Sequence, residues 1–372
     1  MSEVPHAGES DPYSLPPSPL PQCGRIALAA VGAPVMDEAT HSAWAEVIAL
    51  GEDRVGLVVV DGAPRAVPVA QLRHLVAEAL RELHSPARAL EALGQCFSQH
   101  PDPAAGTAQC AVLDGGAGTL LWSVAGPSAP LVVGPDGRRL LTGGDGSALG
   151  RADGGFRQSE VAVEAGATVV LGPHGADDDG FDDFAAAAAR HHDLAPDDLA
   201  ALLADTASGG DPVLLLARLI PAPLSERLPA DPRRLPALRR RIGAWSALAA
   251  LSDDTTADLQ LMLSEAVTNS VEHAYRDGPA GAFVYSVRWR DDGAVRVEVQ
   301  DFGRWRPPPT DPGYRGRGLA VIHTLADEVT LEVDESGTRV AFTVPGDPSP
   351  LAQRRPVPGQ AQWWVTGTGD AR

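Results

Sequence analysis

The sequence predicts a two-domain α+β protein. Its 372 residues exceed the usual size of one domain, and 44% of them are hydrophobic, so each of two domains can bury a core. Strand-like runs and amphipathic helices follow one another twice along the chain. Five prolines between Pro221 and Pro236 separate the two halves.

The composition excludes several classes of protein. A net charge of −19 argues against a nucleic-acid partner, because phosphates bind to basic surfaces. No apolar run approaches the ~20 residues of a membrane span, and the polar N-terminus lacks the pattern of a secretory signal. Three cysteines show no metal-site spacing, so we expect a reducing, cytoplasmic location. The chain has no lysine, which rules out the lysine-containing phosphate loop and the usual protein kinases.

The first half is expected to place strands on both sides of helices. Residues 1–22 lack hydrophobic periodicity and are predicted to be disordered, and the first domain is predicted to span 23–220. The predicted strands are 25–31, 44–50, 54–60, 108–113, 119–125, 130–133, 138–141, two within 161–171, and 212–219. The predicted helices are 69–83, 86–96, one ending at 191, and 197–207. The aspartates at 177–183 do not fit an EF-hand, and acidic residues at a helix N-terminus are the ordinary explanation.

The second half is predicted to span 224–346, after a linker at 221–223. The expected order is an arginine-rich helix (237–251), a longer helix after Asp253, two alternating strands (283–289 and 295–301), a short helix ending near 327, and two last strands. Residues 347–372 are rich in Pro, Gln and Gly and are predicted to be a disordered tail.

The stretch S-E-A-V-T-N-S-V-E-H-A-Y, residues 264–275, contains Asn269, the only asparagine in the chain. On a helix Glu265, Asn269 and His273 are spaced i, i+4, i+8 and share a face. The surrounding positions are largely apolar, so we expect this amide to be half-buried. The face can present a carboxylate and an amide to one ligand.

Further features of the second half suit the binding of Mg-ATP. Asp301 ends a strand and is followed by Gly303. An ionised carboxylate at this position can accept a hydrogen bond from the exocyclic amine of adenine. Gly337 and Thr338 form the last turn. Asn269 offers the oxygen that a largely hydrated magnesium ion needs from protein.

A Gly-bracketed arginine pair precedes the short helix. Gly316 and Gly318 let the backbone approach phosphate oxygens at the N-terminus of the helix. Arg315 and Arg317 add positive charge there, in a chain without lysine.

These motifs resemble the GHKL (HATPase_c) ATPase domain, and specifically the small anti-sigma-factor serine kinases of the RsbW type. The stretch 264–275 is similar to the N box, D-F-G to the first glycine box and R-G-R-G-L-A-V-I to the second. The resemblance implies a two-layer α/β sandwich that uses ATP and Mg. It implies that Glu265 is the general base for a substrate serine, Asn269 the Mg ligand and Asp301 the adenine partner. The remaining implied pocket residues are Gly303, Gly316, Gly318 and Thr338. The first glycine box departs from the family at Trp305.

The first half resembles the metal-dependent serine phosphatases of the stage II sporulation E (PPM) type, whose fold is an α/β sandwich. The resemblance rests on W-A-E-V-I-A-L-G-E-D-R-V-G-L-V-V-V-D-G, on A-V-L-D-G-G-A-G-T-L-L-W-S-V-A-G and on V-E-A-G-A-T-V-V-L. The family holds two metal ions on carboxylates. Here Ala43, Pro173 to Gly175 and Gly210 occupy positions where the family has ligands. Asp61 is the clearest survivor of the metal site and Asp211 a second candidate, so we expect this half to lack phosphatase activity.

The resulting prediction is a cytoplasmic serine kinase that regulates a sigma factor by phosphorylating an anti-anti-sigma (STAS-type) partner. The alternatives are a non-catalytic regulator that sequesters a partner and an active phosphatase. The arginines at 239–241 are the candidate partner surface, although basic residues on one helix also occur on merely solvated faces. The oligomeric state stays open, and a homodimer is one option.

Overall fold

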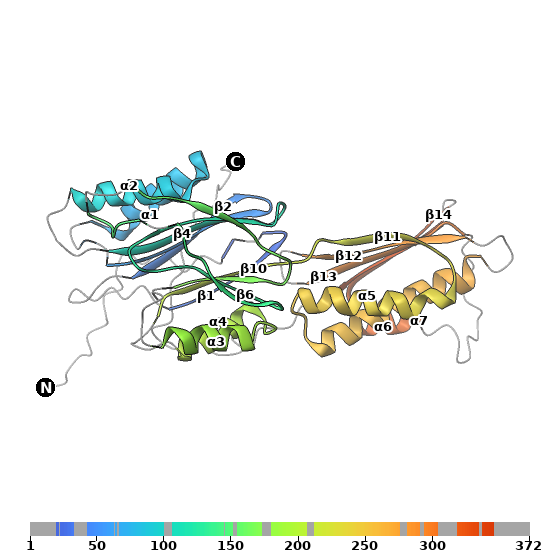
Figure 1. Cartoon of the computed structure of the whole chain (residues 1–372). Helices are drawn as coiled ribbons and strands as arrows, with labels where there is room; N and C mark the ends of the chain where they lie inside the picture. Colours follow the sequence, from blue (N-terminus) through green and yellow to red (C-terminus); the bar gives the residue numbers. More distant parts are fainter. Residues whose placement is uncertain are drawn as a thin grey trace, which may run out of the picture.

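The computed structural model describes residues 20–21, 23–32, 43–62, 64, 67–99, 106–144, 146–151, 155–172, 180–206, 212–275, 281–290, 294–303, 318–334 and 337–345. The predicted α+β class is confirmed, because helices pack on antiparallel sheets in both halves (Figure 1). Among the described residues, no helix combines the length and apolar composition needed to cross a membrane.

The N-terminal half is a four-layer sandwich built on two antiparallel five-stranded sheets. One sheet has the order β1-β10-β9-β6-β7 and the other β2-β3-β4-β5-β8. The strands are β1 (Ile26–Val31), β2 (Trp44–Gly51), β3 (Arg54–Asp61), β4 (Thr107–Asp114), β5 (Thr119–Ala125), β6 (Leu131–Gly134), β7 (Gly137–Leu140), β8 (Ser159–Ala162), β9 (Thr168–Leu171) and β10 (Leu214–Leu219).

Helices cover the outer face of each sheet of this half. Helices α1 (Val69–Leu83) and α2 (Pro86–Ser98) pack on the second sheet, and α3 (Phe181–Arg190) and α4 (Pro196–Thr206) on the first (Figure 1). A further core lies between the two sheets. Because β3 is covered on both faces, its interior positions are all buried, which explains the continuous apolar run V-G-L-V-V-V in the sequence.

The C-terminal half has two layers. Its antiparallel sheet has the order β11-β12-β13-β15-β14, and three helices cover one face (Figure 1). The elements are β11 (Leu224–Pro229), α5 (Leu235–Leu248), α6 (Asp253–His273), β12 (Ala282–Trp289), β13 (Val295–Asp301), α7 (Gly318–Leu325), β14 (Asp327–Asp334) and β15 (Gly337–Val344). Only one face of β13 meets the helices, so buried and half-buried residues alternate along V-R-V-E-V-Q-D.

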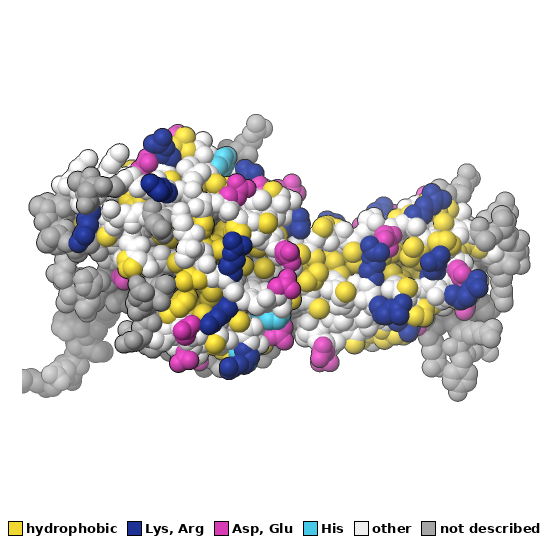
Figure 2. All heavy atoms as spheres, in the orientation of Figure 1, with side chains coloured by type: hydrophobic (Ala, Val, Ile, Leu, Met, Phe, Trp, Pro, Cys, Tyr) yellow, Lys and Arg dark blue, Asp and Glu magenta, His cyan; other side chains and the backbone are white. Residues whose placement is uncertain are grey.

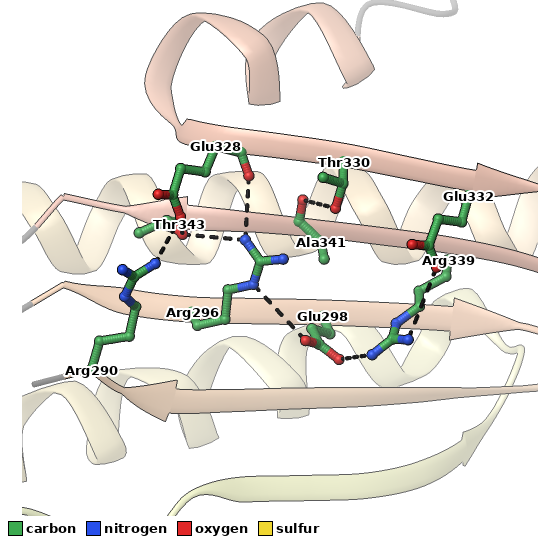
Figure 3. Close-up of polar contacts among 9 residues, drawn as sticks. All are labelled: Arg290, Arg296, Glu298, Glu328, Thr330, Glu332, Arg339, Ala341 and Thr343. Carbon is green, nitrogen blue, oxygen red and sulfur yellow. Dashed lines mark hydrogen bonds and ion pairs between the residues drawn. The ribbon is translucent and has the colours of Figure 1, made fainter. Parts of the chain in front are cut away.

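The face of this sheet that the helices leave uncovered carries a network of arginines and glutamates (Figure 3). Arg290 pairs with Glu328 at 2.7 Å, and Arg339 pairs with Glu298 at 2.5 Å. Arg296 lies between them, 3.9 Å from Glu298, and donates to the Glu328 carbonyl at 3.3 Å. The Arg339–Glu298 pair joins the neighbouring strands β15 and β13, which favours their pairing, whereas Arg290 and Arg296 reach across β15 to Glu328 of β14.

The proline-rich stretch contains two elements that the sequence does not predict. Strand β11 and a short 3₁₀ helix, Pro232–Arg234, lie among the five prolines from 221 to 236, after the predicted linker at 221–223. Strand β11 tolerates proline because it is an edge strand, paired only with β12, and Pro229 is its last residue, opposite Ala282.

The connection between the halves is short and held at both ends. Ile220 donates its backbone N–H to the Arg25 carbonyl at 2.9 Å, and the Arg25 guanidinium donates to the Ile220 carbonyl at 3.2 Å. On the other side, the Trp245 indole N–H of α5 donates to the Ala222 carbonyl at 3.0 Å. Pro221 stands between these two attachments.

Candidate active site

Helix α6 positions the carboxylate and the amide singled out by the sequence. Its N-cap is Ser252, whose hydroxyl accepts from the Thr255 N–H at 3.1 Å, and two aspartates follow in the first turn. One stripe of α6 is buried against the sheet, namely Leu259, Met262, Leu263, Ala266 and Val267. Glu265 and Asn269 are half-buried beside this stripe, one turn apart.

Gly318, the first residue of α7, lies directly against both side chains. A Cβ atom added to Gly318 would lie 2.7 Å from Glu265 Oε2 and 3.1 Å from Asn269 Nδ2. The structure therefore brings together three predicted site residues that are up to 53 positions apart in sequence. A larger residue at 318 would occupy the space in which the carboxylate and the amide meet.

The Asn269 amide is the feature of this cluster that fits a ligand. Its Nδ2 atom is buried and has no hydrogen-bond partner among the described residues. A buried N–H without an acceptor costs about 1–3 kcal/mol, so its retention needs a reason. An anionic oxygen such as that of a phosphate would satisfy it, and the Oδ1 atom of the same amide is a ligand of the kind that Mg accepts.

Asp301, at the end of β13, is a buried carboxyl with 4% of its surface exposed. Its Oδ1 accepts the backbone N–H of Gly303 at 3.1 Å and that of Thr338 at 3.3 Å, and Ser270 donates its hydroxyl to the carboxylate. Burial raises the pKa of Asp301, and these three hydrogen bonds oppose the shift. The helix of Asn269 and the strand end of Asp301 are thus connected through the adjacent residue, Ser270.

Two glycines allow the backbone to close around Asp301. Gly337 has φ of 141°, and an added Cβ would lie 2.0 Å from the Asp301 carbonyl oxygen. An added Cβ on Gly303 would lie 2.2 Å from the carbonyl oxygen of Ala274, just after α6. Only glycine fits at either position, so the predicted assignment of Gly303 to the site has a steric reason.

Some of the predicted residues are not among those that the structure describes. Arg315, Gly316 and Arg317 fall outside the described residues, as does Trp305, and so does the side chain of His273. Thr338 is buried and contributes its backbone N–H to Asp301.

The sequence analysis missed two residues of the site, Ser270 and Tyr275. Ser270 directly follows Asn269, and its distance from Asp301 is 31 positions, so no spacing rule connects them. Tyr275 closes the S-E-A-V-T-N-S-V-E-H-A-Y stretch, and its hydroxyl contacts the residues around Asp301. A polar aromatic residue just after a helix that carries site residues was the available signal.

The N-terminal half has few candidate metal ligands among its described residues, as its sequence predicts. Asp61 is half-buried at the end of β3, opposite Thr107. Within the described ranges, no group of three or more His, Cys, Asp or Glu residues could hold a metal ion. Residues 173–175 and Asp211 lie outside those ranges, so the expected lack of phosphatase activity stays a prediction.

The arginines at 239–241 are all exposed, but two of them already have partners within the domain, and their role as a partner surface stays a prediction. Arg239 donates to the Ser264 hydroxyl at 2.8 Å, which ties α5 to α6, and Arg241 pairs with Glu226 of β11 at 2.8 Å. Arg240 is exposed between them. Figure 2 shows arginine side chains spread over the C-terminal half, several beside acidic side chains.

A polar cleft of about 780 Å³ lies between the two halves. Glu52 and Asp53, in the turn between β2 and β3, line one wall, and Arg288, Arg290 and Arg296 line the other. These arginines lie near one end of the β12–β13 pair, whereas Asp301 lies at the other end, opposite Phe283. The cleft is therefore distinct from the cluster around Asn269.

Comparison with known proteins assigns a family to each half. Residues 228–344 match the model of the histidine kinase-like ATPase domain, and residues 51–216 match that of stage II sporulation protein E (SpoIIE). The first of these matches contains helix α6, the strand end at Asp301 and Gly318.

Several curated proteins are similar in sequence to the C-terminal half. The anti-sigma F factor of Heyndrickxia coagulans is 32% identical over 112 residues, which is 27% of this chain and 76% of that protein. The serine-protein kinase RsbW of Bacillus velezensis is 30% identical over 134 residues, 32% of this chain and 81% of that protein.

Among solved structures, the RsbU and RsbW domains of Rv1364c from Mycobacterium tuberculosis match 87% of this chain and 96% of that chain, with 27% identity and a TM-score of 0.47. From the curated relatives and the two domain models, the chain belongs to the family of the RsbW serine-protein kinases and the anti-sigma F factor, and it carries a SpoIIE domain ahead of its kinase-like ATPase domain.

Proposed function

We propose that the C-terminal half is an ATP-dependent protein-serine kinase whose substrate is a serine of a small anti-anti-sigma (STAS-type) protein. The observation that carries the proposal is the contact of Gly318 with Glu265 and Asn269, beside an Asn269 amide that has no described partner. The relatives named serine-protein kinase and anti-sigma factor support the same activity and partners.

In this mechanism the residues of the chain bind and orient ATP and deprotonate the substrate serine. Asp301 accepts the exocyclic amine of the adenine ring, and its own hydrogen bonds to Gly303 and Thr338 keep the carboxylate fixed. The Asn269 side chain would hold Mg, and Arg315, Gly316, Arg317 and Gly318 would line the phosphates. Magnesium, when bound with ATP, neutralises the negative charge that develops on the phosphates.

Glu265 is the proposed general base. It would accept the proton of the substrate serine hydroxyl as that oxygen attacks the terminal phosphate of ATP, while the bond between the β- and γ-phosphates breaks and ADP leaves. Its half-buried position on α6, one turn before Asn269, places proton acceptor and metal ligand on one face of one helix. Positioning and electrostatics supply most of the acceleration in such a transfer.

Mg-ATP binding and phosphotransfer test the two roles separately. Calorimetry should show Mg-ATP binding to the unaltered protein and its collapse in Asn269→Ala. Glu265→Gln should keep ATP affinity within a few fold while phosphotransfer to the serine partner falls by 10²-fold or more. Unimpaired transfer in Glu265→Gln would refute the general-base role. ATP binding without any transfer would instead favour a regulator that sequesters its partner.

The wider role follows from the same family. We propose that the protein acts in the cytoplasm and that a sigma factor competes with the anti-anti-sigma protein for it. The SpoIIE domain is proposed to act without phosphatase activity, with Asp61 a remnant of the metal site.

A further inference from the structure

Tyr275 occupies a junction of three elements. It lies two residues beyond the end of α6, and its hydroxyl reaches the first residue of β12 and the first residue after β13. The hydroxyl donates to the Ala282 carbonyl at 2.6 Å and accepts the Phe302 N–H at 2.8 Å. Both hydrogen-bonding capacities of the phenol are therefore used by backbone groups of the sheet.

The ring of Tyr275 is held in place by a glycine. A Cβ added to Gly281 would lie 1.9 Å from the ring, so a side chain at 281 would displace the ring. Beside it, the backbone of Ala274 touches Gly303 so closely that a Cβ on Gly303 would lie 2.2 Å from the Ala274 oxygen. The two residues that follow α6 are thus packed against the ends of both strands.

The amide that Tyr275 fixes lies inside the turn that holds the Asp301 carboxylate. Phe302 stands between Asp301, which accepts at Oδ1, and Gly303, whose N–H donates to that Oδ1 at 3.1 Å. A rotation of the Phe302 peptide would move the Gly303 N–H and the Asp301 side chain together. The Phe302 side chain is 43% exposed, and the Arg227 guanidinium lies over its ring at 5.1 Å from the ring centroid, so the Tyr275 hydroxyl holds the backbone of this residue while Arg227 contacts its side chain.

We propose that Tyr275 is a positioning residue for nucleotide-base selection: its hydroxyl fixes the Asp301–Gly303 turn to the end of the helix that carries Glu265 and Asn269. The proposal rests on the proposed function and goes beyond it, because it assigns ATP affinity and base discrimination to a residue that does not touch the nucleotide. Tyr275 acts on the base through Asp301, while the metal and phosphate contacts on α6 do not depend on its hydroxyl.

The test is Tyr275→Phe, which keeps the ring and removes both hydrogen bonds. The matched control is Tyr285→Phe on β12, which removes a single hydrogen bond, to Glu226 Oε2 of the edge strand β11 at 3.0 Å. With about 1 kcal/mol for each of the two hydrogen bonds lost, Tyr275→Phe should raise the KM for ATP roughly 30-fold. Its kcat at saturating ATP should stay unchanged, and its preference for ATP over GTP should shrink by a similar factor. Tyr285→Phe should change neither quantity.

Three outcomes would overturn the assignment. One is an unchanged KM and ATP/GTP preference in Tyr275→Phe, even if the variant unfolds at a lower temperature. Another, which needs no variant, is fast exchange of the Phe302 amide hydrogen in the unaltered protein, since an anchored amide should exchange slowly. Failure of the unaltered protein to bind Mg-ATP would overturn the proposed function and this assignment together, whereas ATP binding with no effect of Tyr275→Phe overturns this assignment alone.

Discussion

At the scale of single residues, the site contains groups that folding alone does not favour. The raised pKa of Asp301 means that its folded state binds a proton more readily than its unfolded state does. The stability contributed by protonation is complete below the ordinary carboxyl pKa and is lost as pH rises through the raised value. At neutral pH the ionised Asp301 therefore costs stability, and its retention indicates a function.

Asp301→Asn tests this cost. Asparagine keeps an oxygen that accepts from Gly303 and Thr338 but carries no charge to bury, so the nucleotide-free variant should unfold at a higher temperature than the unaltered protein at pH 7. ATP affinity should fall at least tenfold, because one acceptor for adenine is replaced by a donor. Thermal unfolding from pH 5 to 8 and calorimetry measure both effects. A stability difference that shrinks as pH rises would contradict the assignment of the charge as the cause.

The sequence was least informative about the contacts of single side chains. Asn269 and Glu265 could be predicted because they repeat at helical spacing in one segment. Ser270 and Tyr275 could not be placed, because their partners, Asp301 and Phe302, are reached only after the sheet has formed. The arginines at 239–241 illustrate the same limit, since Arg239 and Arg241 bind different elements although they are two positions apart.

At the scale of elements, the approach of α7 to α6 determines the geometry of the site. The contact needs a residue without a side chain at 318, where the two helices meet. Gly318→Ala should displace the Glu265 carboxylate or the Asn269 amide and lower phosphotransfer about 100-fold, because a shift of about 1 Å in a catalytic group has that effect.

Gly243→Ala on α5 is the matched control for this substitution. The nearest atom to a Cβ at 243 is the end of the Gln260 side chain, at 3.0 Å, which can move. This variant should keep phosphotransfer and gain up to about 1 kcal/mol from the better helix propensity of alanine. Equal activity of the two variants would mean that Gly318 is not sterically required.

Elements were predictable where the pattern was periodic. The alternation at 295–301 and the apolar run at 54–60 correctly predicted strands, and the structure shows that helices cover one face of the first while the second is covered on both faces. Strand β11 was not predicted, because Pro229 and the prolines on either side of the strand disfavour strand structure, and its place at the edge of the sheet becomes evident only once β12 is beside it.

At the scale of the whole molecule, the two halves differ in what their sites retain. The N-terminal half has two sheets with helices on both outer faces, but within the described ranges no group of three or more His, Cys, Asp or Glu residues that could hold a metal ion surrounds Asp61. Two hard cations need several carboxylates, so Mn²⁺ or Mg²⁺ should produce no hydrolysis of a phosphoserine peptide. A phosphate-release assay on the full chain measures this. Metal-dependent turnover that Asp61→Ala abolishes would show that the site is active.

The attachments of Ile220 and Ala222 have a mechanical consequence for this molecule. Ile220 is fixed to the N-terminal half through Arg25, and Ala222 is fixed to the C-terminal half through Trp245. The ring of Pro221 locks its own φ torsion, which leaves the ψ torsion of Pro221 and the φ torsion of Ala222 free between the two attachments. The joint is therefore not a flexible tether, and the halves also meet at a second place, where a Cβ added to Gly166 would lie 3.0 Å from Leu248 Cδ2 of α5. The width of the cleft between Asp53 and Arg288 is thus set by two connections rather than by one.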